Sequence, residues 1–213
     1  MVKVKVCGIT NERDLFYAVS AGADAVGFIV NVESSPRNLT LDKARELMNM
    51  VPVFVSRVAV TVVNSLQDVM DLQQKLKPDF IQVHGDQTLS FNSINSISNT
   101  GLIKAISFKN DVLKEINNRI DNFDAILVDT FVEGKFGGTG IANDFTRCRK
   151  IRDEIYPKPF ILAGGLTPEN VKEAVTTVKP FAVDACSGIE LSPGIKDEKK
   201  LYNFIEKAKG VRF

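Results

Sequence analysis

Two short apolar runs of the chain each end in a side chain that can transfer a proton. The run at 2–6 ends in Cys7, and the run at 125–128 ends in Asp129. A thiolate and a carboxylic acid presented in this way could remove and supply protons on a small substrate. The thiolate needs a lowered pKa, and the acid needs a pKa raised by desolvation. The alternatives are a buried apolar cysteine and a loop-capping aspartate.

Two later loops contain glycines that suit a bound anion. The segment AGGLTP contains Gly164 and Gly165, and the segment DACSGIE contains Ser187 and Gly188. Glycine lets backbone N–H groups face a phosphate, and a short helix that begins after Ser187 would add its dipole. We therefore predict a phosphate site here, with glycines of tight turns as the alternative. A further glycine-rich segment at 133–140 is either a mobile cover or a loose loop.

Three more side chains are candidates for contact with a ligand. Arg37 carries a planar guanidinium suited to a carboxylate, although an isolated loop arginine is usually solvated. His84 ends an apolar run and either orients a substrate or forms a local hydrogen bond. Cys148 falls in a helical pattern and is expected in the core. Cys186 neighbours the predicted phosphate loop, where the glycine amides would do the binding.

Composition excludes several classes of protein. The 213 residues carry a formal net charge of +1, with 44% hydrophobic and 25% charged residues, which gives no electrostatic argument for nucleic acid or a membrane surface as a partner. Three cysteines and one histidine do not form a disulfide framework or a zinc site. Because the amino terminus lacks the continuous apolar segment of a signal peptide and no apolar run approaches 18 residues, we expect neither a signal peptide nor a membrane span. We therefore predict a protein of the reducing cytoplasm.

Short apolar runs alternate with amphipathic stretches along the whole chain. The runs are continuous rather than alternating, which is typical of strands buried on both faces. We predict strands near 2–7, 24–30, 53–61, 79–84, 102–107, 124–129, 159–163 and 181–184. We predict helices near 11–21, 41–50, 65–76, 87–99, 110–119, 143–154, 168–178 and 196–209. Asn11, Ser65 and Asp111 stand at expected N-caps, and Pro168 in an expected first helical turn.

Eight strand–helix units favour a closed parallel barrel over an open doubly wound sheet. The fold prediction is therefore α/β, a single (βα)8 TIM barrel domain spanning 1–213. In both architectures the chemistry belongs at the carboxyl ends of the strands. Because the polar candidates follow predicted strands, the residues favour a cofactor-free sugar-phosphate isomerase with its active site at that face.

The chain resembles the phosphoribosylanthranilate isomerase family of tryptophan biosynthesis along nearly its whole length. The stretches that carry this resemblance occur in the family's order and spacing. They are KVCGIT at 5–10, GADAVGFI at 22–29, SPR at 35–37, QVHGD at 82–86, ILVDT at 126–130, GGTG at 137–140, AGGLTPENV at 163–171 and VDACSGIE at 183–190.

The resemblance implies an Amadori rearrangement of N-(5-phosphoribosyl)anthranilate to 1-(2-carboxyphenylamino)-1-deoxyribulose 5-phosphate. It places the family's base on Cys7, its acid on Asp129 and its substrate-contacting arginine on Arg37. It also implies that Asp184 and His84 line the substrate pocket, and that the phosphate loops fall on the glycines named above.

The same resemblance implies no metal or organic cofactor and a small phosphorylated substrate. We expect a monomer or homodimer. The alternatives are another phosphosugar-converting barrel, such as a histidine-pathway isomerase or a thiamine-phosphate synthase, and a non-catalytic barrel that binds a phosphorylated metabolite.

Overall fold

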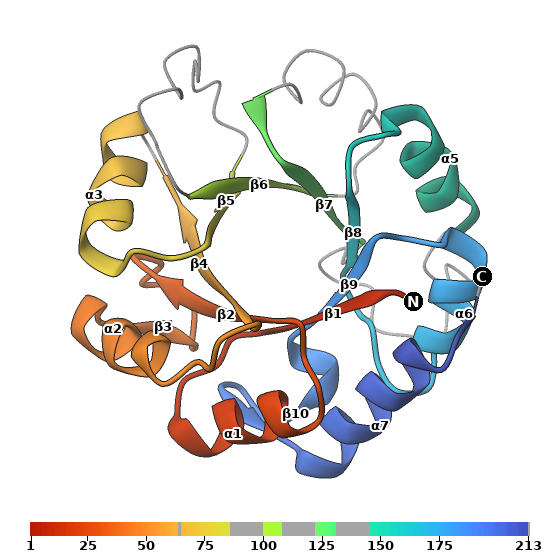
Figure 1. Cartoon of the computed structure of the whole chain (residues 1–213), viewed down its shortest axis with the longest axis horizontal. Helices are drawn as coiled ribbons and strands as arrows, with labels where there is room; N and C mark the ends of the chain where they lie inside the picture. Colours follow the sequence, from red (N-terminus) through yellow and green to blue (C-terminus); the bar gives the residue numbers. More distant parts are fainter. Residues whose placement is uncertain (64, 86–99, 108–121, 131–144, 213) are drawn as a thin grey trace.

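The computed structural model describes residues 1–63, 65–85, 100–107, 122–130 and 145–212. In these residues, eight parallel strands form a closed barrel (Figure 1). Strand β1 pairs with both β2 and β9, and these two pairings close the sheet. The barrel strands are β1 (Lys3–Cys7), β2 (Ala25–Val30), β4 (Ser56–Val62), β5 (Phe80–His84), β6 (Gly101–Ser107), β7 (Ala125–Asp129), β8 (Phe160–Ala163) and β9 (Ala182–Ala185).

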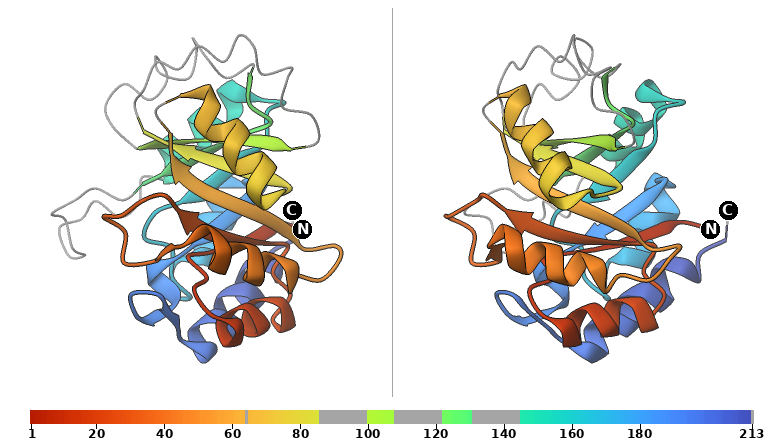
Figure 2. Two further views of the ribbon diagram at one scale, coloured as in Figure 1. Left: turned by 90° about the vertical axis from the view of Figure 1, so that its left-hand side faces the viewer. Right: turned by 60° about the vertical axis from the view of Figure 1, so that its left-hand side comes forward.

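Helices surround this barrel on its outer side (Figures 1 and 2). They are α1 (Glu12–Ser20), α2 (Leu41–Asn49), α3 (Leu66–Leu76), α5 (Phe145–Ile155), α6 (Val171–Val178) and α7 (Glu198–Lys209). Within the residues described, no helix is long and apolar enough to cross a membrane. The predicted helices at 87–99 and 110–119, the N-cap Asp111 and the segment 133–140 lie outside the described residues.

Several short elements complete the described structure. Strand β3 (Asn38–Leu39) extends the sheet beside β2, and the short helix η3 (Ser187–Ile189) follows β9. Strands β10 (Glu190–Ser192) and β11 (Ile195–Lys196) then form an antiparallel pair. This pair brings the chain back to the mouth of the barrel before α7 begins.

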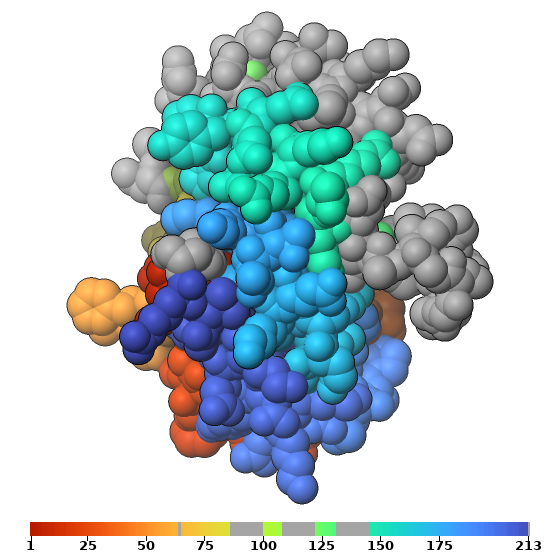
Figure 3. Space-filling model, turned by 90° about the vertical axis from the view of Figure 1, so that its right-hand side faces the viewer, coloured from red at the N-terminus to blue at the C-terminus, as the bar shows by residue number. Residues whose placement is uncertain are grey.

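The barrel strands are buried on both faces, as their continuous apolar patterns predict. One apolar cluster lies between strands and helices and includes Phe28 and Phe204. A second fills the barrel and includes Val58, Ile103 and Leu127. Figure 3 shows the side chains of α5, α6 and α7 lying next to one another over one flank of the barrel. The closed (βα)8 fold is therefore confirmed over the open sheet.

Local side-chain chemistry sets the beginnings of several helices. The Asn11 side chain accepts a hydrogen bond from the Asp14 amide at 2.9 Å, which caps α1 as predicted. Ser65 and Asp68 form a reciprocal capping box at the start of α3, which confirms the second predicted cap. These caps fix the residue at which each helix begins after the strand that precedes it.

Two predicted boundaries are wrong. The strand predicted at 53–61 begins only at Ser56, because Val53 and Phe54 lie in an exposed turn where Phe54 adopts a φ of +72°. Pro168 precedes α6 instead of standing in its first turn. There the Asn170 side chain accepts a bond from the Thr167 amide and donates one to the Gly165 carbonyl, which holds a separate turn before the helix begins.

Candidate active site

Cys7 and Lys5 lie on the same face of β1, because alternate residues of a strand point to the same side. Both side chains are buried, and Cys7 belongs to the apolar cluster inside the barrel. Lys5 Nζ lies 2.8 Å from Asp184 Oδ2 on the neighbouring strand β9, with which it is paired in register. The thiol of β1 therefore stands beside a buried ammonium–carboxylate pair.

Gly27 on β2 provides the space for this arrangement. A Cβ atom at Gly27 would lie 2.9 Å from Cys7 Sγ and 3.2 Å from Lys5 Nζ. Because one point above this glycine is so close to both atoms, the thiol and the ammonium are near neighbours. Any larger residue at position 27 would push them apart.

The surroundings of Cys7 favour its thiolate. A hydrogen bond from Cys186 and the positive charges of Lys5 and Lys196 hold the pKa of Cys7 well below the ordinary thiol value of 9.0, although burial opposes this. Burial also opposes the ammonium of Lys5, yet the nearby Asp184 and Cys7 raise its pKa. A stable ammonium beside a thiolate is the pairing that an acid–base cysteine requires.

For Asp184, the surroundings raise the pKa instead of lowering it. Burial, and the negative charges of Cys7 and Asp129, raise its pKa to about 7 despite the attraction of Lys5. One ammonium is thus shared by two neighbouring acidic groups, Cys7 and Asp184. Within the described residues, Asp184 Oδ1 is buried and has no hydrogen-bond partner. The predicted pocket residue Asp184 therefore lies directly beside the predicted base.

Asp129 ends β7, as predicted, and is in register with Ser107 and Ala163 on the flanking strands. His84 ends β5, and Gln82 Nε2 lies 2.7 Å from His84 Nε2. Burial lowers the pKa of His84, while the charges of Cys7 and Asp129 raise it to a smaller extent. The ring is therefore neutral at pH 7 and accepts the hydrogen bond of Gln82. Because the charges of Cys7 and Asp129 both act on His84, the carboxyl ends of β1, β5 and β7 lie close to one another.

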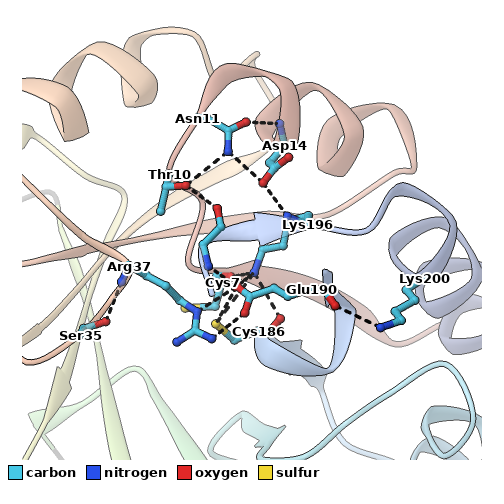
Figure 4. Close-up of polar contacts among 11 residues, drawn as sticks. Cys7, Thr10, Asn11, Asp14, Ser35, Arg37, Cys186, Glu190, Lys196 and Lys200 are labelled. Carbon is cyan, nitrogen blue, oxygen red and sulfur yellow. Dashed lines mark hydrogen bonds and ion pairs between the residues drawn. The ribbon is translucent and has the colours of Figure 1, made fainter. Parts of the chain in front are cut away.

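Arg37 lies in the loop before β3 and is held at the mouth by Glu190 (Figure 4). Its Nε and Nη2 donate to the two carboxylate oxygens of Glu190 at 2.9 and 2.5 Å. Lys196 Nζ donates to the same carboxylate at 2.9 Å, and Arg37 and Lys196 lower the pKa of Glu190 although burial opposes them. This pairing fixes the direction of the Arg37 guanidinium.

The predicted phosphate loops contact one another. Gly164 and Gly165 have φ values of +90° and +62°, which favour glycine in both positions. A Cβ at Gly188 would lie 2.0 Å from the Leu166 carbonyl oxygen, so only glycine allows the loop after β9 to approach the loop after β8. Thr130 donates to the Gly164 carbonyl at 2.8 Å, which ties the end of β7 to the same loop.

All the predicted site residues lie in strand ends at one face of the barrel or in the loops that follow these ends. The structure brings Cys7, Arg37 and Asp184 into one charged cluster with four residues that sequence reasoning missed in this role. These are Lys5, Cys186, Glu190 and Lys196. A lysine inside a continuous apolar strand was the available signal for Lys5, because a buried ammonium requires a partner.

Fold and site together define a (βα)8-barrel protein with an acid–base cluster and a glycine-lined loop pair at the carboxyl ends of its strands. The chain matches the family model "N-(5'phosphoribosyl)anthranilate (PRA) isomerase" over residues 4–207. It is 41% identical over 215 residues, covering all of both sequences, to the N-(5'-phosphoribosyl)anthranilate isomerase of Methanothrix thermoacetophila.

Two solved structures agree with this match. The phosphoribosyl anthranilate isomerase of Thermotoga maritima superposes with a TM-score of 0.85 at 37% identity, covering 99% of this chain and 100% of that one. A phosphoribosyl anthranilate isomerase in complex with reduced 1-(o-carboxyphenylamino)-1-deoxyribulose 5-phosphate has a TM-score of 0.81 at 34% identity, with the same coverage. The chain belongs to the phosphoribosylanthranilate isomerase family, which confirms the predicted resemblance and the isomerase class.

Proposed function

We propose that the chain catalyses the Amadori rearrangement of N-(5-phosphoribosyl)anthranilate in tryptophan biosynthesis, with Cys7 as the general base and Asp129 as the general acid. Family membership supports the reaction. The observation that carries the residue roles is the buried Cys7 thiol at the carboxyl end of β1, beside the Lys5 ammonium, which favours the thiolate. A binding protein has no use for such a group, whereas a proton-abstracting enzyme requires it.

The reaction needs only proton transfers. As the general acid, Asp129 donates a proton to the furanose oxygen as the ring opens to an imine. The imine acidifies the proton on the second carbon of the sugar, and the Cys7 thiolate removes it. The resulting enolamine tautomerises to the aminoketone product. Substrate and product are isomers, so we propose that neither a metal nor an organic cofactor takes part.

Arg37 is proposed to bind the carboxylate of the anthranilate ring. Its Nε and Nη2 are bound to Glu190, which leaves the Nη1 side of the guanidinium to face a ligand. The bidentate pair with Glu190 keeps this donor in a fixed orientation. Asp184 and His84 are proposed to line the pocket between this end and the sugar, where both respond to the charge of Cys7.

The substrate phosphate is proposed to bind between Gly164, Gly165, Ser187 and Gly188. These residues belong to two loops in direct contact, and the left-handed glycines of the first loop turn its backbone sharply after β8. Phosphate sites after the last two strands recur in barrels of this class. Holding the substrate at both its carboxylate and its phosphate positions the sugar between base and acid.

Two substitutions test the assignment of acid and base. Cys7→Ala and Asp129→Asn are each expected to lower kcat by about 10²-fold or more, because each removes a proton-transfer group. The assay follows product formation from synthetic substrate. Cys148→Ala is the matched control, since Cys148 is buried in α5 away from the strand ends. Near-wild-type turnover by either variant would refute the role of that residue.

The same turnover assay separates the alternatives. A non-catalytic barrel would bind the phosphorylated compound without converting it, and another phosphosugar isomerase would convert a different substrate. Neither alternative accounts for the joint presence of this thiolate and the Asp129 carboxylate at one barrel face.

We further propose that residues 1–213 form a single domain that works in the cytoplasm on a small phosphorylated substrate, as a monomer or homodimer, and binds neither nucleic acid nor membrane. The near-neutral charge supports the absence of nucleic acid and membrane as partners. The fully exposed Phe54 beside the exposed Val53 supports a contact between two copies. Sedimentation equilibrium of the protein and of Phe54→Ser decides between the two assembly states: a dimer that dissociates in the variant would place the contact at this turn.

A further inference from the structure

Cys7 and Cys186 stand at matching positions on neighbouring strands. Strands β1 and β9 run parallel, and their last paired residues are Val6 and Ala185. Each cysteine is the next residue after that pair. Neighbouring strands lie about 4.8 Å apart, which falls within the range of Cα separations, about 4.4–6.8 Å, that a disulfide spans.

Lys196 holds the two cysteines together at the backbone. Its ammonium donates to the Cys7 carbonyl at 2.6 Å and to the Cys186 carbonyl at 3.3 Å (Figure 4). Because a single nitrogen reaches both oxygens, the two backbones stay close together beyond the end of the strand ladder. Lys196 is almost completely buried and is also fixed by Glu190, so this constraint is part of the core of the site.

The two sulfur atoms face the same space. Cys186 packs against the apolar cluster inside the barrel to which Cys7 belongs. A Cβ at Gly8 would lie 2.9 Å from Cys186 Sγ, so this sulfur sits directly over the residue that follows Cys7. The thiol of Cys186 is also the largest influence that lowers the pKa of Cys7. Cys186 is only half-buried, which gives a small polar reagent access from the mouth of the barrel.

We propose that Cys7 and Cys186 form a modification site, at which hydrogen peroxide or a small organic hydroperoxide oxidises the pair to a disulfide and stops catalysis. The Cys7 thiolate attacks the peroxide O–O bond, gives a sulfenic acid and releases hydroxide, which takes up a proton to form water. The Cys186 thiolate then attacks the Cys7 sulfur and displaces a second hydroxide, which the former Cys186 proton converts to water. Two thiols and one peroxide thus yield one disulfide and two waters.

The charges around Cys186 suit this second step. In the reduced protein, the hydrogen bond to Cys7, burial and the negative charge of Cys7 all raise the pKa of Cys186. Formation of a neutral sulfenic acid removes that charge. The Lys196 ammonium, 3.9 Å from Cys186 Sγ, and the nearby Arg37 then favour the Cys186 thiolate. The first oxidation therefore activates the thiol that completes the bond.

Mass spectrometry tests the bond directly. The reduced full-length protein is treated with hydrogen peroxide, quenched with catalase, blocked with iodoacetamide and digested with trypsin without reduction. We expect peptide 6–13 to be linked to peptide 173–196, both read from the sequence. The link should be absent in Cys186→Ser. It should persist in Cys148→Ala, the matched control for the remaining cysteine.

Activity gives the second measurement, and this part rests on the proposed role of Cys7. Oxidation of the wild-type protein should lower turnover by about 10²-fold, as loss of the base does, and dithiothreitol should restore it. Each variant is compared with its own untreated activity. Cys186→Ser should lose activity irreversibly under prolonged peroxide, because without a partner thiol the sulfenic acid proceeds to sulfinic acid.

Failure of the two proposals is distinguishable. Peroxide that converts wild-type Cys7 to sulfinic acid without any linked peptide would overturn the disulfide. Equal recovery of the wild-type protein and Cys186→Ser with dithiothreitol would also overturn it. A linked peptide with full retention of activity would support the bond and overturn the assignment of Cys7 as the base.

Discussion

Two regions of the barrel mouth are built on different physical principles. The region where β1 meets β9 consists of charged side chains, with Lys5 paired to Asp184, Lys196 paired to Glu190, and Cys7 between them. The region of the loops after β8 and β9 consists of backbone, fitted together by glycines. The charged region determines the protonation states of Cys7 and Asp184. The glycine loops determine the shape of the proposed phosphate site.

This difference has a consequence for how each region can be damaged. A group that titrates can be retuned by charge, burial or pH, and its effect reaches every neighbour that shares its ion pairs. Backbone amides do not titrate, so the loops after β8 and β9 are affected by a larger side chain rather than by a change of charge. Substitutions that change charge should therefore affect the first region, and substitutions that change side-chain volume should affect the second.

The largest effect is expected from Lys5→Met. Removal of the ammonium leaves Asp184 and Cys7 as buried acids without their shared cation, and loss of one partner of a buried ion pair costs about 3–5 kcal/mol. The free energy of unfolding in urea measures this loss. Lys3→Met is the matched control on the same strand, because the exposed Lys3–Asp24 pair contributes about 0–1 kcal/mol. Equal losses in the two variants would show that the buried pair is unimportant.

The pH dependence of stability provides the second test of the charged region. The pKa of Asp184 is raised to about 7 in the folded protein, from 3.8, so the folded state holds a proton that the unfolded state releases. Its contribution to stability is complete below pH 3.8 and is lost as the pH rises through 7. We expect Asp184→Asn to remove this decline between pH 4 and pH 7 in urea unfolding curves. Parallel curves for both proteins would contradict the raised pKa.

Gly188→Ala tests the backbone region by volume alone. Its Cβ would lie 2.0 Å from the Leu166 carbonyl oxygen, so the two loops must separate, at a cost of about 1–3 kcal/mol. The KM for substrate should rise while the pH profile of kcat keeps its shape. Gly22→Ala is the control, since a Cβ there meets no atom within 4 Å, so that any loss comes from the positive φ of Gly22 and not from volume. A shifted pH profile in Gly188→Ala would show that the regions are not separable.

Arg37→Ala, the smallest of these effects, lies where the two regions meet. The variant should weaken binding of the reduced product analogue by about 10- to 100-fold, the value of one or two hydrogen bonds to a charged group, with a smaller effect on kcat. Calorimetric titration with that analogue measures it. Arg37→Lys keeps the charge but not the bidentate geometry, so its affinity for the analogue should lie between those of the wild-type protein and Arg37→Ala. An unchanged affinity would exclude Arg37 from ligand binding.

The elements that the sequence predicted correctly depend on local chemistry. Strands buried on both faces give continuous apolar runs, and their last residues, Cys7 and Asp129, therefore mark the carboxyl ends. Asn11 and Ser65 cap their helices through residues only three positions away. The turn at Phe54 was missed because an apolar side chain with positive φ looks like a strand residue in a hydropathy pattern.

The remaining part of the site depends on closure of the barrel. Arg37 and Glu190 are 153 positions apart, and Lys5 and Asp184 are 179 apart. Nothing near Lys196 in the sequence indicates that its ammonium binds the Cys7 carbonyl. The register of β1 against β9 sets the Lys5–Asp184 pair, and the approach of the loop after β2 to β10 sets the Arg37–Glu190 pair. Only the three-dimensional structure provides both. The sequence could therefore locate the reactive groups but not the charges that tune them.

The hydrogen bond from Lys196 to the Cys7 carbonyl also bears on when, during synthesis of the chain, the site can form. A ribosome delivers Cys7 almost at once, but the cation that locks its backbone arrives nearly 190 residues later. The backbone of Cys7 therefore lacks this hydrogen bond until translation is nearly complete. A polypeptide terminated between Asp129 and Lys196 would contain Cys7 and Asp129 but lack the Lys196 ammonium, one of the two positive charges that favour the Cys7 thiolate.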